Sequence, residues 1–173
     1  MAELFDLVDR RDRVVGWVER SMAHGRPDLI HRVSHVLVFN KKGELFLQKR
    51  AADKDVQPGK WDTSVGGHLA VGETYRKGAK RELAEEIGVT RVRIIFCHKY
   101  LHSNDYESEF VSTFRCEYEG PFILQEEELD DGRFWSVDEI VSRRAEGIFT
   151  PNFLDEFDRC RPMLPLWGIK APD

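Results

Sequence analysis

The sequence predicts a layered α/β (α+β) domain, and three observations support this fold class. Alternating or β-branched runs typical of strands recur along the chain, while only two or three segments are rich in helix-forming residues. The 173 residues suit one hydrophobic core, and no internal repeat is apparent. We therefore expect a single domain over residues 1–173, and neither a helical bundle nor an all-β sandwich.

Composition excludes several classes of protein. A hydrophobic content of 41%, a charged content of 33% and a net charge of −5 are typical of a soluble globular protein. No apolar run approaches the roughly 20 residues that span a bilayer, and the N-terminus lacks the features of a secretory signal, so we expect a cytoplasmic protein with no membrane partner. Three cysteines without a C-x-x-C pair indicate neither a disulfide framework nor a thiolate zinc site. The acidic balance argues against binding of a nucleic-acid polymer.

The first half of the chain is expected to be mostly strands. Two short runs separated by "RRDR" predict an N-terminal β-hairpin at about residues 3–20. Residues 32–40 and 44–50 flank the turn "KKG" and predict a second hairpin. A polar loop over 51–62 then leads to "TSVGGH", whose two glycines permit unusual backbone conformations or close approaches.

The second half combines helices and strands. "TYRKGAKRELAEEIGV" predicts a helix through Glu86, with Gly88 at its C-terminal boundary. Strands are expected over 91–100 and 107–118, and "GRFWSVDEI" predicts a strand followed by a helix with a Ser136/Glu139 capping box. A last helix is expected from about Thr150, with Pro151 in its first turn, before the Pro-rich residues 161–173 end regular structure.

Three carboxylates are crowded on the helix that precedes Gly88. Helical geometry places Glu82, Glu85 and Glu86 within an arc of roughly 100°, beside an apolar stripe of Leu83 and Ile87. Like charges at this spacing destabilise a helix, whereas several carboxylates together suit a hard divalent cation. The pattern favours a Mg²⁺ site over a simple solvated face.

The spacing of these residues also matches a known signature. Gly67, Glu73, Arg81, Glu82, Glu85, Glu86 and Gly88 occupy the fixed positions of the Nudix box, over residues 67–89, and the chain resembles the Nudix hydrolases. The resemblance implies a mixed sheet between helices and hydrolysis of a nucleoside diphosphate linked to another group. It implies that Glu82, Glu85 and Glu86 hold Mg²⁺ or Mn²⁺ and that Arg81 orients a carboxylate. Glu73 would organise the box, and Gly67 would serve the geometry of a substrate-facing loop. The general base stays open between Glu86 and the later residues Glu126, Glu127 and Glu128.

The segments flanking the box resemble a second branch of the superfamily, isopentenyl-diphosphate isomerase. The matching segments are "SMAHGRPDLIHR", "LFLQKRAADKDVQPGKWDTSVGGH" and "YESEFV". This resemblance implies a second divalent metal with five ligands, and diphosphate contacts from two cations. The ligands are His24, His31, His68, Glu107 and Glu109, and the cations are Arg50 and Lys54. We expect His35, His98 and His102 to be ordinary surface or core residues.

One position separates the two branches. The isomerase has its catalytic cysteine directly before Gly-His, where this sequence has Gly66. Glycine has no side chain to transfer a proton, so we expect a metal-dependent hydrolase of a small-molecule diphosphate. The alternatives are isopentenyl-diphosphate isomerisation and non-catalytic sensing of a diphosphate or nucleotide. The group attached to the diphosphate and the choice between monomer and homodimer stay open.

Overall fold

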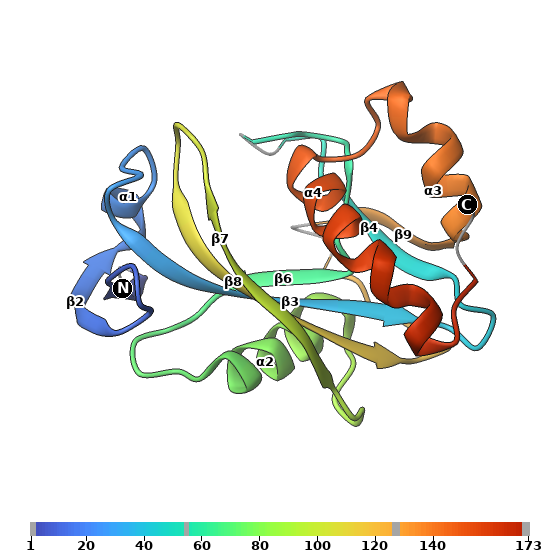
Figure 1. The fold of residues 1–173 in the computed structure, drawn as a ribbon, viewed down its shortest axis with the longest axis horizontal. Helices are drawn as coiled ribbons and strands as arrows, with labels where there is room; N and C mark the ends of the chain where they lie inside the picture. Colours follow the sequence, from blue (N-terminus) through green and yellow to red (C-terminus); the bar gives the residue numbers. More distant parts are fainter. Residues whose placement is uncertain (1–2, 54–55, 126–128, 171–173) are drawn as a thin grey trace.

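A mixed β-sheet forms the centre of the protein, with helices on both faces (Figure 1). This computed structural model describes residues 3–53, 56–125 and 129–170. The seven strands are β3 (Ile30–Phe39), β4 (Leu45–Arg50), β5 (Trp61–Asp62), β6 (Val65–His68), β7 (Ile95–Ser103), β8 (Ser108–Glu117) and β9 (Leu129–Trp135). β3 runs parallel to β8, and the other pairs are antiparallel. The predicted α+β class is confirmed.

Alternation along β3 divides the core into two layers. Val36 and Val38 pack with helix α2 (Tyr75–Ile87) on one face of the sheet. Leu37 and Phe39 pack with helix α4 (Pro151–Cys160) on the other face. His31 and His35 lie an even number of residues from Leu37 along β3, so both side chains project from the face that carries α4.

Helix α2 begins and ends as the sequence predicts. The Thr74 side chain accepts a hydrogen bond from the Lys77 backbone N–H at the start of the helix. Gly88 ends it with a left-handed φ of 72°, a conformation that favours glycine. Leu83 and Ile87 are buried, which fixes the rotation of the helix and the direction of its carboxylates.

The expected hairpin of residues 32–40 and 44–50 is wrong beyond its turn. β3 and β4 share the single pair Phe39/Leu45 and then diverge. Residues 61–68 fill the resulting wedge, first as β5 on β4 and then as β6 on β3, so "TSVGGH" is largely a strand and not a loop. The Ser64 hydroxyl closes the apex, because it accepts from Val38 N–H and donates to the Phe46 carbonyl.

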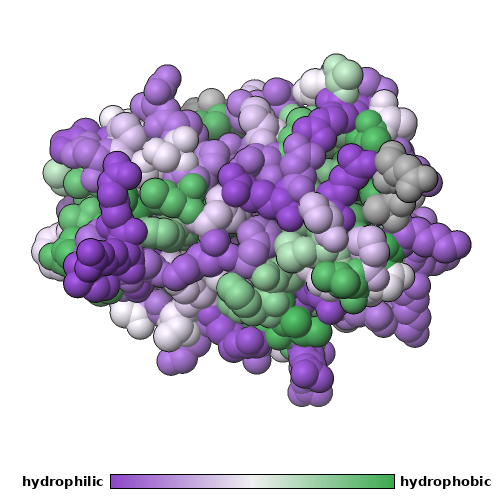
Figure 2. Space-filling view, viewed as in Figure 1, coloured by the Kyte–Doolittle hydropathy of each residue, from purple (hydrophilic) through white to green (hydrophobic). Residues whose placement is uncertain are grey.

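The N-terminal residues form a separate two-stranded sheet of β1 (Leu4–Val8) and β2 (Val14–Glu19), followed by the unexpected short helix α1 (Arg20–Ala23). Asp12 in the turn of this hairpin anchors it to the main body. It accepts hydrogen bonds from Arg32 (2.6 Å), Lys99 (2.6 Å) and Tyr75 (3.0 Å). Figure 2 shows a largely hydrophilic face, with hydrophobic side chains at the left edge and in another group at the lower centre.

The C-terminal region confirms two predicted helix starts. Ser136 caps α3 (Val137–Arg143), and Thr150 caps α4, with Pro151 at its first position. The 3₁₀ helix η1 (Arg144–Glu146) follows α3. The expectation that regular structure ends at 161 is wrong, since Arg161–Trp167 form a second 3₁₀ helix, η2, whose Leu164 is buried in the core beside α4. No helix within the described residues is long and apolar enough to cross a membrane.

Candidate active site

Arg81 is the centre of a hydrogen-bond network on helix α2. Its guanidinium donates to both carboxylate oxygens of Glu73, at 3.1 and 3.0 Å, in the forked geometry that suits arginine. It also donates to Glu82 at 2.7 Å, to Glu85 at 2.9 Å and to the His68 carbonyl at 2.9 Å. One side chain thus connects the loop before the helix, the helix itself and strand β6.

Glu82 is buried against Gly67 of β6. A Cβ built on Gly67 would lie 2.1 Å from the Glu82 carboxyl carbon, so a side chain at position 67 would displace this carboxylate. Burial raises the pKa of Glu82, although the charge and hydrogen bond of Arg81 oppose the shift. Gly67 therefore provides the space in which Glu82 lies.

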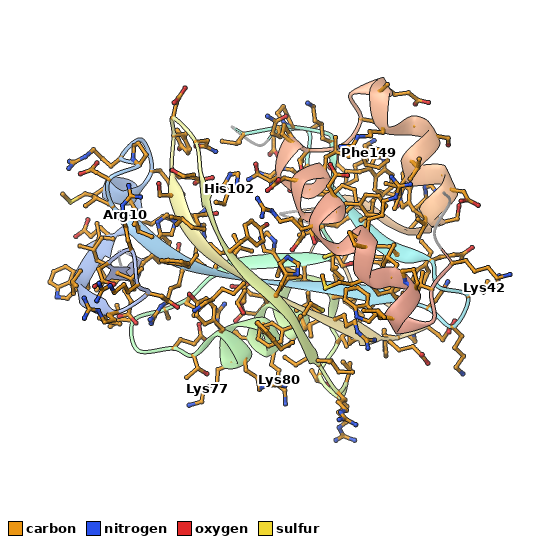
Figure 3. All side chains as sticks on the ribbon, in the orientation of Figure 1. Arg10, Lys42, Lys77, Lys80, His102 and Phe149 are labelled. Atoms are coloured by element: carbon orange, nitrogen blue, oxygen red, sulfur yellow. The ribbon has the colours of Figure 1, made fainter. Side chains whose placement is uncertain are left out.

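Glu86 lies in the wedge of the sheet and Glu85 faces solvent. The Gly66 N–H points at a Glu86 carboxylate oxygen, 3.4 Å away. Burial and the neighbouring charge of Glu82 raise the pKa of Glu86 to about 8. The cations Lys77 and Lys80 point away from the sheet (Figure 3), so they do not neutralise this pair.

These carboxylates fit a divalent cation. The charge of Glu82 raises the pKa of Glu86, and the partly exposed Arg81 contacts Glu82 at 2.7 Å. Burying charged carboxylates without compensation is costly, and a hard cation with oxygen ligands removes that cost. The structure brings together Arg81, Glu82, Glu85 and Glu86, as the sequence analysis expects.

A second cluster contains the five predicted histidine and glutamate residues. Glu109 of β8 lies 3.1 Å from His31 Nε2 and 3.3 Å from His68 Nε2, while His24 Nε2 lies 3.8 Å from Glu107. The ligand atoms of His24, His31 and His68 lie within 4.8 Å of one another, and so do those of His31, Glu107 and Glu109. The two groups of possible ligands thus share His31.

The chemistry of this cluster also fits a metal ion. The Nε2 atoms of His24 and His68 are buried without a hydrogen-bond partner among the described residues. Burial and the charge of Glu109 raise the pKa of Glu107 to about 7. The hydrogen bond from His31 and the charges of His31 and His68 outweigh burial and lower the pKa of Glu109. Mixed imidazole and carboxylate ligands suit Mn²⁺, Fe²⁺ or Zn²⁺.

The N-terminal hairpin covers the histidines. The ring of Phe5 stacks on His68 with 4.5 Å between centroids and on His31 with 5.2 Å. Phe5 itself is buried with Val18 and Ala23. No local sequence pattern predicts this contact of Phe5, since the contact arises from the docking of the whole hairpin.

The structure describes one of the two predicted substrate-binding cations. Arg50 at the end of β4 lies beside the wedge, 3.5 Å from Asp62, and donates to the Val56 carbonyl at 3.0 Å. Lys54 lies outside the described residues, as do Glu126, Glu127 and Glu128. Arg50 is therefore the predicted substrate-binding cation whose contacts the structure describes.

The structure adds a residue that sequence reasoning missed. His35, expected to be an ordinary surface or core residue, donates from Nδ1 to the fully buried carboxylate of Glu156 on α4, at 3.0 Å. The sequence held one signal: Glu156 shares the buried face of α4 with Phe153, Phe157 and Cys160. The other two histidines contact Cys160 (His98, 3.8 Å) and Asn104 (His102, 3.2 Å).

Comparison with known proteins agrees with this geometry. The NUDIX domain model matches residues 29–157. A Nudix hydrolase of Yersinia pestis is 32% identical over 88% of this chain and 82% of its own length. An isopentenyl-diphosphate Delta-isomerase of Streptomyces avermitilis is 32% identical over 93% of this chain and 85% of its own.

Solved structures show the same fold. The crystal structure of DR0079 from Deinococcus radiodurans superposes with a TM-score of 0.80 at 25% identity, covering 91% of this chain and 99% of the other. MutT protein from Methanosarcina mazei has a TM-score of 0.62 at 22% identity, covering 75% of this chain and 94% of its own. The chain therefore belongs to the NUDIX domain family, and it is an enzyme of the Nudix hydrolase class, which acts on pyrophosphate bonds.

Proposed function

We propose that the protein hydrolyses the diphosphate linkage of a small organic diphosphate, such as a nucleoside diphosphate derivative, with Mg²⁺ or Mn²⁺ bound at Glu82, Glu85 and Glu86. The observation that carries the proposal is the Arg81 network, which holds Glu82 beside Gly67 and Glu85 on the same helix, with the Glu86 carboxylate 3.4 Å from the Gly66 N–H. Nudix enzymes use divalent metals and small-molecule substrates, in agreement with this assignment.

Each residue has a distinct part in the proposed reaction. When bound, a divalent cation neutralises phosphate oxygens and activates the attacking water. Arg81 orients Glu82 and Glu85, and Glu73 holds Arg81 in place through its forked pair. Arg50, at the end of β4, attracts the diphosphate, and we assign the same part to Lys54. The proton acceptor is Glu86 or a residue of 126–128.

We propose that the second cluster, His24, His31, His68, Glu107 and Glu109, binds another divalent metal. The buried Nε2 of His24 supports this proposal, since it has no hydrogen-bond partner among the described residues and buried polar atoms without partners are costly. Phe5 shields the cluster from water and lowers the local dielectric, which strengthens metal coordination.

A panel of substrates tests the function. Nucleotide sugars, dinucleotides, nucleoside triphosphates and prenyl diphosphates are incubated with Mg²⁺ or Mn²⁺ in ¹⁸O-labelled water, and product masses are measured. Hydrolysis predicts one labelled phosphate product for at least one class. Formation of dimethylallyl diphosphate from isopentenyl diphosphate would instead establish the isomerase alternative, and ligand-dependent stabilisation without turnover would establish a sensor.

A pair of matched variants tests the site. Glu86→Gln removes a charged ligand and should lower kcat by about 100-fold or more, since metal positioning and proton transfer both depend on this carboxylate. Glu146→Gln, on the exposed 3₁₀ helix η1, makes the same chemical change away from the site and should leave kcat unchanged. Equal activity of the two variants would contradict the assignment of Glu86.

A further inference from the structure

His35 reaches the proposed site from the side of the sheet opposite to α2. It projects from β3 toward Gly66 of β6, its cross-strand partner. A Cβ built on Gly66 would lie 2.8 Å from His35 Cδ2 and 3.0 Å from His35 Nε2, distances that a real side chain would not tolerate. The imidazole therefore fills the space that a side chain at position 66 would need.

Buried partners fix the orientation of the ring. Nδ1 lies 3.0 Å from Glu156 Oε1, and the same oxygen accepts a hydrogen bond from Thr113 at 2.7 Å. Glu156 and Thr113 have no exposed surface, so the carboxylate cannot turn to solvent. With Nδ1 committed to Glu156, only Nε2 is free to reach another molecule.

The ring carries a positive charge at neutral pH. Burial alone would lower its pKa, but the charge of Glu156 and the hydrogen bond to it outweigh burial and raise the pKa to about 9. The carboxylates of Asp62 and Glu109 act in the same direction. His35 thus has an N–H at both ring nitrogens.

The free nitrogen faces the wedge. About 16% of the His35 side chain is exposed, and Nε2 has no hydrogen-bond partner within the described part of the chain. Gly66 is contacted by the His35 ring on one side, while its N–H points at Glu86. An anion beside Gly66 would therefore lie within reach of both Nε2 and the carboxylate-bound cation proposed above.

We propose that His35 is a substrate-binding residue, whose Nε2–H donates a hydrogen bond to a phosphate oxygen of the bound diphosphate above Gly66. This inference rests on the proposed diphosphate hydrolysis. Glu156 is the positioning residue, since it holds the ring through Nδ1 and keeps it protonated. Gly66 is required because a side chain at position 66 would occupy the space of the His35 ring. The glycine that stands in place of the isomerase cysteine therefore makes room for this histidine.

The binding of methylenediphosphonate with Mg²⁺, measured by calorimetry, tests the inference. His35→Gln should raise Kd by about 10-fold to 100-fold, the range for one charge-assisted hydrogen bond. Because this variant also leaves Glu156 buried without its charged partner, the double variant His35→Gln/Glu156→Gln is needed. It keeps a neutral hydrogen-bonded pair, and should recover most of the thermal midpoint but none of the lost affinity.

His98→Gln is the matched control, since His98 also contacts α4, through Cys160, but does not face Gly66. It should bind methylenediphosphonate as the wild type does. In wild-type protein, the ¹⁵N resonance of His35 Nε2 should shift when the ligand is added, and Nδ1 should shift less.

The outcomes separate the two proposals. If wild-type protein hydrolyses a diphosphate and the double variant binds methylenediphosphonate as tightly as wild type, the role of His35 is refuted while the proposed function stands. If affinity recovers together with the thermal midpoint, His35 is only structural and the inference is also overturned. If wild-type protein neither hydrolyses diphosphates nor binds the analogue, both proposals are wrong.

Discussion

Substitution of Arg81 by lysine isolates the value of the forked guanidinium, because the charge is kept and the geometry is lost. Arg81 donates five hydrogen bonds, to Glu73, Glu82, Glu85 and the His68 carbonyl. A lysine ammonium has three donors on one nitrogen, so at least two of these bonds are lost. At about 1 to 1.5 kcal/mol each, Arg81→Lys should lower the free energy of unfolding by about 2 to 3 kcal/mol.

Urea unfolding of metal-free protein, followed by tryptophan fluorescence, measures this loss. The corresponding fall in the thermal midpoint is about 4 to 12 °C for a chain of this size. Arg26→Lys is the matched control, since Arg26 forms an equally forked pair with Asp28 but on the exposed surface, and it should not change stability measurably. If Arg81→Lys is as stable as Arg26→Lys, the network does not depend on the fork and the reasoning fails.

Three further predictions follow from the site. For Glu86, the folded pKa of about 8 lies above the unfolded value near 4.5, so stability contributed by the neutral carboxyl is present below about pH 4.5 and is lost as pH rises to about 8. The free energy of unfolding of metal-free wild type, measured by denaturant titration, should therefore fall over this pH range, and that of Glu86→Gln should fall less. An equal dependence of the free energy of unfolding on pH in the two proteins would contradict the raised pKa of Glu86. Mn²⁺ should raise the thermal midpoint of wild type more than that of His31→Ala or Glu109→Ala, whereas an identical rise would place the second metal elsewhere. Gly67→Ala should fold but displace Glu82 and reduce kcat at least about 10-fold. Gly16→Ala, where a Cβ meets no atom within 4 Å, is the control and should retain full activity. Full activity in Gly67→Ala would show that the position of Glu82 does not depend on the absence of a side chain at residue 67.

Local chemistry made the helix and its carboxylates predictable from sequence. Thr74, Gly88 and the spacing of Glu82 and Glu86 act within one or two helical turns, so their outcome depends little on the rest of the chain. The residues of the histidine cluster were identified only through a family resemblance, because Glu109 lies 78 positions from His31 and meets it through the parallel pairing of β3 with β8.

Strand pairing between distant parts of the chain explains why the second predicted hairpin was wrong. The turn after Phe39 is local and was recognised, but the partners of β3 beyond that turn come from β6 and β8, and no short-range pattern specifies them. The 3₁₀ helix at Arg161–Trp167 was missed because its prolines argue against an α-helix, whereas burial of Leu164 stabilises a tighter turn. Predictions on the extent of the single domain, on cytoplasmic location and on oligomeric state stay predictions.

The wedge between β3 and β4 has a consequence for how two sets of side chains cooperate. A continuous sheet would place a layer of paired backbone between a helix on one face and imidazoles on the other. Here the backbone beside Gly66 meets Glu86 at its N–H and His35 across its missing side chain. Gly66 is therefore contacted from both faces of the sheet, and a ligand seated beside it would be held by chemistry from both faces at once.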